Sequence, residues 1–74
     1  IDKVIDNQTI LIGEVGLGGE IRSVGHIDKR ITEAKKLGFK TAIIPTGNMK
    51  SIKQDNAIKI ITADNVKDAI EKLL

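Results

Sequence analysis

Side chains that could carry out chemistry are few and widely spaced in this sequence. His26 is the single histidine, and cysteine is absent. A zinc site needs several nitrogen or sulfur ligands at close spacing, which argues against a metal site here. Neither Ser23 nor Ser51 lies in a Gly-x-Ser-x-Gly motif, which surrounds the nucleophilic serine of α/β-hydrolases. We therefore expect His26 to lie at the start of a helix, beside Gly25, and both serines to be structural or solvent-facing.

Glycines cluster in residues 16–19, Gly-Leu-Gly-Gly, which invites comparison with phosphate-binding loops. A dinucleotide fingerprint is a Gly-x-Gly-x-x-Gly run that opens a helix, and a P-loop needs Gly-Lys followed by Ser or Thr. Neither pattern occurs: residues 20–24, which follow the glycines, have the polar–apolar alternation of a strand rather than a helix, and no glycine is followed by lysine. We expect these glycines to form a tight hairpin turn.

Basic residues gather in and after the stretch 27–37. They are Lys29, Arg30, Lys35, Lys36 and Lys40. Such a cluster can contact the phosphates of duplex DNA in a sequence-independent and salt-sensitive way. The formal net charge is only +2, however, and Phe39 is the only aromatic residue, so stacking on bases is not indicated. A solvated helix face is the alternative that the sequence favours.

The spacing of apolar residues predicts the elements that position these side chains. Residues 9–12, extended by Val15, form an apolar run typical of a buried strand, with 20–24 as its hairpin partner. Helical spacing follows from Ile27 to Leu37, and Gly38 predicts the end of this helix. Strand 41–44 comes next and ends at Pro45, so the stretch 24–44 predicts a strand–helix–strand unit with parallel strands.

The second half continues the same alternation. Asn48 is expected to cap a short helix over 49–52, and a polar loop at 54–56 precedes strand 58–61. Thr62 or Asp64 is expected to cap a last helix. Its apolar stripe is Val66, Ala69, Ile70 and Leu73. The fold class is therefore α/β (α+β), a small mixed sheet with helices packed on it.

A chain of 74 residues is one small domain or part of one, near the lower limit of independent stability. We expect residues 1–74 to be a single partial domain of a longer protein, since the sequence begins with Ile1 rather than Met. No apolar run reaches the ~18–20 residues of a membrane span. The absence of cysteine fits the cytoplasm.

Residues 13–22, Gly-Glu-Val-Gly-Leu-Gly-Gly-Glu-Ile-Arg, resemble the signature Gly-Glu-Val/Ile-Gly-Leu-x-Gly-Glu-Val/Ile-Arg of RadA/Sms DNA repair proteins. The resemblance continues through Glu33-Ala34 and 37–40 to Ile44-Pro45 and Asn48, about half of the chain. It implies the second half of a fold like that of the Lon proteolytic domain, of the ribosomal protein S5 domain 2-like type. It also implies a parent that acts in recombinational repair as a hexameric, ATP-dependent ring.

The same stretch is similar, more distantly, to Lon proteases, which use a Ser–Lys dyad. Their Gly-Gly-x-Lys motif falls on residues 25–28, so Asp28 occupies the position of the lysine. Lys29 is adjacent, but one helical step turns a side chain by ~100°, so we expect it to point away from that position. The serine loop of Lon lies upstream, and the residues before Thr9 do not contain it. The resemblance thus implies an active site that has lost its catalytic residues, with no catalytic residue in this chain.

We therefore expect a non-catalytic C-terminal module that supports ring assembly through self-association and contacts duplex DNA, without a membrane role. ATP, Mg²⁺ and Zn²⁺ are expected only in other parts of the parent, and no cofactor in this segment. The alternative is a fragment of an active Lon-type Ser–Lys peptidase, which would need an upstream serine in the parent and a usable lysine here. A stand-alone interaction module would need its own start codon, which Ile1 argues against.

Overall fold

The computed structural model describes residues 2–52 and 57–74, and the polar loop expected at 54–56 lies outside these residues. The main element is a four-stranded sheet in the order β1-β2-β5-β6. Its strands are Lys3–Val4 (β1), Thr9–Leu11 (β2), Thr41–Pro45 (β5) and Lys59–Ala63 (β6). β1 is antiparallel to β2, whereas β2, β5 and β6 are parallel to one another. The predicted fold class, a small mixed sheet with helices, is confirmed.

The pairing of the first strands differs from the expectation. β2 pairs in parallel with β5, while the hairpin is made by two short strands of a second sheet, β3 (Glu14–Val15) and β4 (Ile21–Arg22). The prediction that residues 9–12 form a hairpin with 20–24 is therefore wrong. The parallel strand–helix–strand unit exists, but it begins at β2 and not at residue 24.

Gly13 divides the two sheets and gives the physical reason for this difference. Its φ is +154°, and a Cβ added there would lie 2.9 Å from Ile21 Cγ2 and 3.0 Å from Pro45 Cγ. The missing side chain thus lets these two residues approach the main chain closely. The chain leaves the large sheet at Gly13, so Val15 belongs to the hairpin and does not extend β2.

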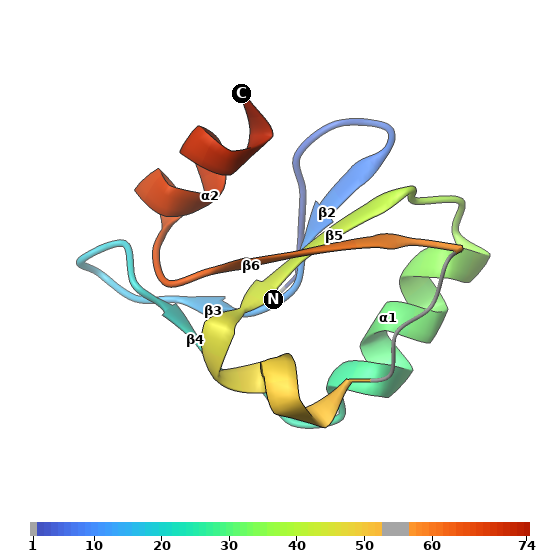
Figure 1. Cartoon of the computed structure of the whole chain (residues 1–74), viewed down its shortest axis with the longest axis horizontal. Helices are drawn as coiled ribbons and strands as arrows, with labels where there is room; N and C mark the ends of the chain where they lie inside the picture. The colour runs from blue at the N-terminus through green and yellow to red at the C-terminus, as the bar shows by residue number, and fades with distance from the viewer. Residues whose placement is uncertain (1, 53–56) are drawn as a thin grey trace.

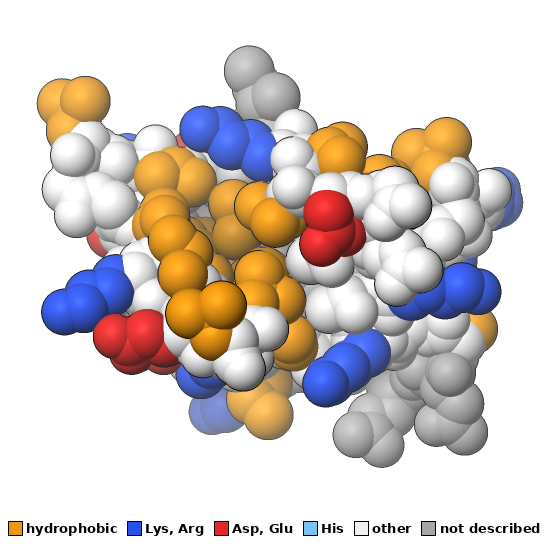
Figure 2. Space-filling model, turned by 90° about the horizontal axis from the view of Figure 1, so that it is seen from above, with side chains coloured by type: hydrophobic (Ala, Val, Ile, Leu, Met, Phe, Trp, Pro, Cys, Tyr) orange, Lys and Arg blue, Asp and Glu red, His pale blue; other side chains and the backbone are white. Residues whose placement is uncertain are grey.

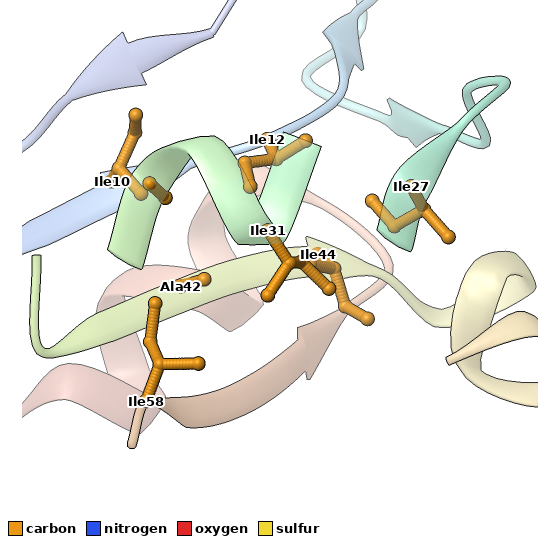
Figure 3. Packing of buried hydrophobic residues seen from close by; sticks show 8 residues of the cluster. Ile10, Ile12, Ile27, Ile31, Ala42, Ile44 and Ile58 are labelled. Carbon is orange, nitrogen blue, oxygen red and sulfur yellow. The ribbon is translucent and has the colours of Figure 1, made fainter. Parts of the chain in front are cut away.

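Two helices lie on opposite faces of the large sheet (Figure 1). Helix α1 (Ile27–Lys36) covers one face over a purely aliphatic set of buried side chains. Figure 3 shows most of them: Ile10, Ile12, Ile27, Ile31, Ala42, Ile44 and Ile58. Helix α2 (Val66–Leu73) and the β3–β4 hairpin contribute to a second, smaller cluster on the other face. No helix within residues 2–52 and 57–74 is long and apolar enough to span a bilayer.

The ends of both helices show how local sequence fixes them. The N–H groups of Gly38 and Phe39 donate to the carbonyls of Lys35 and Ala34, and Gly38 has φ +93°, which confirms the predicted glycine cap of α1. The cap of α2 is Asn65, so the expectation of Thr62 or Asp64 is wrong.

Asn65 immediately precedes the first helical residue of α2, which is the position that a capping side chain must occupy. Its Oδ1 accepts the Asp68 N–H at 2.7 Å, and Asp68 Oδ2 accepts the Asp64 N–H at 3.2 Å. Asp64 thus contributes its backbone N–H, rather than its side chain, to the hydrogen bonds at the start of α2.

Candidate functional site

An open pocket lies where the chain leaves β4 and enters α1. It is lined by residues 24–29 and by Asn48 of the 3₁₀ helix η1 (Thr46–Ser51), and its volume is about 470 Å³. Asp28, which the resemblance to Lon proteases led us to expect at the position of their lysine, is one of the lining residues. This pocket is therefore the candidate functional site.

His26 turns the chain into α1, which confirms its expected place at the helix start. Its backbone is left-handed, with φ 57° and ψ 40°, and its carbonyl accepts the Arg30 N–H at 3.1 Å. The imidazole is exposed and makes no capping hydrogen bond. This sharp turn directs Ile27 into the core, where it is 3% exposed, and leaves Asp28 at the surface.

Asn48 holds the opposite wall of the pocket in place. Its side chain is buried, and its Oδ1 accepts the Val24 N–H at 3.0 Å while its Nδ2 donates to the Val24 carbonyl at 2.9 Å. The prediction that Asn48 caps a helix over 49–52 is wrong, because η1 begins at Thr46 after Pro45. An amide can donate and accept at once, so one side chain satisfies both polar groups of Val24.

Gly47 allows η1 to pack against the strand that leads to the pocket. A Cβ at this position would meet Ser23 Oγ. Ser23 is exposed, as predicted, whereas the side chain of Ser51 lies outside the described part of the chain. The close approach of Ser23 and Gly47 thus supports the Asn48–Val24 contact in holding the two segments together.

Asp28 and Lys29 are both exposed and both line the pocket. Asp28 lies in the first turn of α1, where a negative charge interacts favourably with the helix dipole. Lys29 was expected to point away, but this open pocket extends around the first turn far enough to include it. The seven lining residues supply a carboxylate, an amine and an imidazole, and none of the seven carries a hydroxyl or thiol.

The structure does not gather the basic residues into one patch. Lys29 and Lys36 are seven residues apart, nearly two helical turns, so they share the outer ridge of α1 with Glu33 between them. Arg30 lies on the flank, where its Nη1 is 3.1 Å from Asp2 Oδ1. Lys35 is half-buried, and Lys40 is exposed beyond the end of the helix.

The glycine turn between β3 and β4 is already filled by a carboxylate. Glu20 accepts the Gly18 N–H at 3.0 Å and an Arg22 Nη2 hydrogen bond at 3.0 Å, and a Cβ on Gly16 would collide with it. Hydrogen bonds from its own backbone N–H, from Arg22 and from Gly18 lower the pKa of Glu20. A phosphate would meet this negative charge, so the turn serves as a hairpin, as expected.

The part of the chain that the structure describes contains no cluster of side chains suited to bind a metal ion. Within residues 2–52 and 57–74, no three histidine, aspartate or glutamate side chains gather closely enough to hold an ion. His26 and Asp28 line the same pocket, and among the described residues no third histidine, aspartate or glutamate joins them in a group.

Comparison of the sequence with known proteins places this chain in a family. The model of the Lon protease (S16) C-terminal proteolytic domain matches residues 1–74. DNA repair protein RadA of Chlamydia pneumoniae is 43% identical over 75 residues, which cover 99% of this chain and 17% of that protein. RadA of Halalkalibacterium halodurans is 46% identical over 65 residues (88% and 14%), and RadA of Synechocystis sp. is 45% identical over 69 residues (93% and 13%).

The chain therefore spans only 13–17% of the length of these relatives. The match to the family model and the matches to RadA proteins agree with the resemblance seen in residues 13–22. The chain belongs to the Lon protease (S16) C-terminal proteolytic domain family, and it is homologous to part of DNA repair protein RadA.

Proposed function

We propose that this chain is the non-catalytic C-terminal module of a RadA/Sms-type ATP-dependent DNA repair protein, in which it supports ring assembly and contacts duplex DNA. The observation that carries the proposal is Asp28 on the wall of the pocket at the start of α1, where the resemblance to Lon proteases puts the lysine of their dyad. In this proposal ATP, Mg²⁺ and Zn²⁺ bind other parts of the longer protein, which works in the cytoplasm.

The chemistry of the pocket supports a role without peptide hydrolysis. The lysine of a Ser–Lys dyad takes the proton of the attacking serine, and a carboxylate is a far weaker base than an amine. Lys29 supplies an amine nearby, but it is exposed, whereas a lysine base needs surroundings that disfavour its charged form. Asp28 instead supports the fold, by its place in the first turn of α1.

The outer ridge of α1 is the surface that we propose for duplex DNA. Lys29 and Lys36 are both exposed there, roughly 10 Å apart along a helix that rises 1.5 Å per residue. Two such ammonium groups can contact separate phosphates of one duplex. The relatives are named DNA repair proteins, which supports DNA as the partner.

Binding of this chain to a labelled duplex, measured by fluorescence anisotropy at several salt concentrations, tests the ridge. The variant Lys29→Glu/Lys36→Glu should bind more weakly, and the slope of log K against log salt should fall by about two, close to one per lost phosphate contact. The matched control is Lys50→Glu/Lys67→Glu, which reverses two exposed lysines elsewhere and changes the net charge equally. Equal weakening by both pairs would mean that only net charge matters and would dismiss the ridge.

An active Lon-type peptidase is the competing function, and Lys29 in the pocket wall is the observation that favours it. It predicts that a longer polypeptide carrying this segment hydrolyses an unfolded protein and reacts with a serine-directed fluorophosphonate. Both activities should then be lost in Lys29→Ala. Absence of turnover, together with unchanged DNA affinity on addition of the fluorophosphonate, supports the non-catalytic module.

A further inference from the structure

The sheet face that carries α2 is covered only in part, and least near the β6 edge. Strand register places Leu11, Ile43 and Ile61 side by side on this face, and α2 packs beside them. The next row contains Thr9, Thr41 and Lys59, which pair across β2, β5 and β6. Burial falls toward the β6 edge in both rows: Ile43 is fully buried and Ile61 half-buried, while Thr9 is buried, Thr41 half-buried and Lys59 exposed.

Half of the apolar stripe of α2 is also incompletely buried. Ala69 is 3% exposed, but Ile70 is 53% and Leu73 is 38% exposed. Ile5, which follows β1 in the chain, is 49% exposed. We define the open face as Ile5, Ile61, Ile70 and Leu73. Figure 2 shows apolar side chains forming a band around a hollow on the molecule's upper side, with both basic and acidic side chains at its margins.

The strand order makes an uncovered face unusual. β2, β5 and β6 are parallel, and parallel sheets are found almost always with both faces covered by other elements. A helix of an α/β protein likewise turns its whole apolar stripe toward a core. Both rules point to a further apolar element that belongs on the open face.

Lysine residues at the edges of the open face indicate which charges the missing element would carry. Lys3 shares the face, because it pairs directly with Leu11, and Lys59 lies on the same face across the sheet; both are exposed. An amphipathic segment with acidic residues beside its apolar stripe would complement them. The RadA relatives offer a source, since the matched part covers only 17% of the Chlamydia pneumoniae protein.

We propose that the open face is the docking site for an amphipathic, acid-flanked segment from another part of the same longer polypeptide. This docking completes the second core of the sheet. It is independent of DNA binding at the α1 ridge, which lies on the opposite side of the sheet, so the two proposals can fail separately.

The test compares the 74-residue chain alone with the same chain grafted in place of the matching part of Chlamydia pneumoniae RadA. Hydrogen exchange of the α2 backbone amides should be at least about tenfold slower in the graft, because docking opposes local opening. Ile70→Asp should return α2 in the graft to its exchange rate in the chain alone. The matched control is Leu17→Asp, at a fully exposed leucine on the hairpin turn, which should leave α2 protected.

Equal exchange of α2 in the two settings, or equal effects of the two variants in the graft, would overturn the proposal. A second copy of the chain is the other possible occupant. It would be indicated by a dimer of the isolated chain in sedimentation experiments that Ile70→Asp dissociates, without added protection in the graft. That result would also overturn the proposal.

Discussion

Replacing Asn48 by alanine removes both hydrogen bonds that hold Val24 against η1. The amide accepts from the Val24 N–H at 3.0 Å and donates to the Val24 carbonyl at 2.9 Å. A net hydrogen bond contributes about 1 kcal/mol, and a buried polar group left without a partner costs about 1–3 kcal/mol. Because Val24 is only half-buried, water can relieve part of this cost, and we expect a loss of about 2–3 kcal/mol.

A loss of this size should be large for such a small domain. At about 0.05–0.15 kcal/mol per residue, the whole chain is stable by roughly 4–11 kcal/mol. The melting temperature should fall by about 8–24 °C, since 1 kcal/mol corresponds to roughly 4–8 °C in a domain of this size. Urea unfolding followed by far-ultraviolet circular dichroism measures the change, because the chain has neither Trp nor Tyr for fluorescence.

Two further variants make the measurement specific. Asn7→Ala makes the same chemical change at an exposed asparagine and should alter the stability by less than about 0.5 kcal/mol. Asn48→Asp keeps the acceptor for the Val24 N–H but loses the donor to its carbonyl, so its stability should fall as well. If Asn48→Ala costs no more than Asn7→Ala, the two hydrogen bonds do not hold the pocket wall and the reasoning is refuted.

Two other predictions follow from close packing and from charge. Gly13→Ala should destabilise the chain by about 1–3 kcal/mol in the same urea assay, because its Cβ would press on Ile21 and Pro45. Gly25→Ala, with nothing within 4 Å of its Cβ, is the control, and equal losses would contradict the packing argument. Folding lowers the pKa of Glu20 below its ordinary value of 4.5, so its contribution is present above that pH and disappears as the pH falls through the folded value. Glu20→Gln should therefore weaken the loss of stability on acidification, and an unchanged acid profile in urea unfolding would contradict this assignment.

The elements predicted well from sequence are those governed by neighbours along the chain. The apolar spacing from Ile27 and the glycine at position 38 predict both ends of α1, because a helix repeats every 3.6 residues and is capped by adjacent groups. Strand 41–44 and the last helix follow from similarly short patterns. The place of Asp28 in the first turn of α1 likewise follows from the predicted start of this helix.

Sequence by itself determined the class of fold, the aliphatic core and the family resemblance. Tertiary structure decided which strand pairs with β5, which residues satisfy Val24, and how the basic residues separate around α1. Several short strands offer similar apolar patterns and backbone hydrogen bonds, so local pattern alone cannot choose among them. Asn48 and Val24 are 24 residues apart, and their partnership exists only once β5 and η1 bring them together.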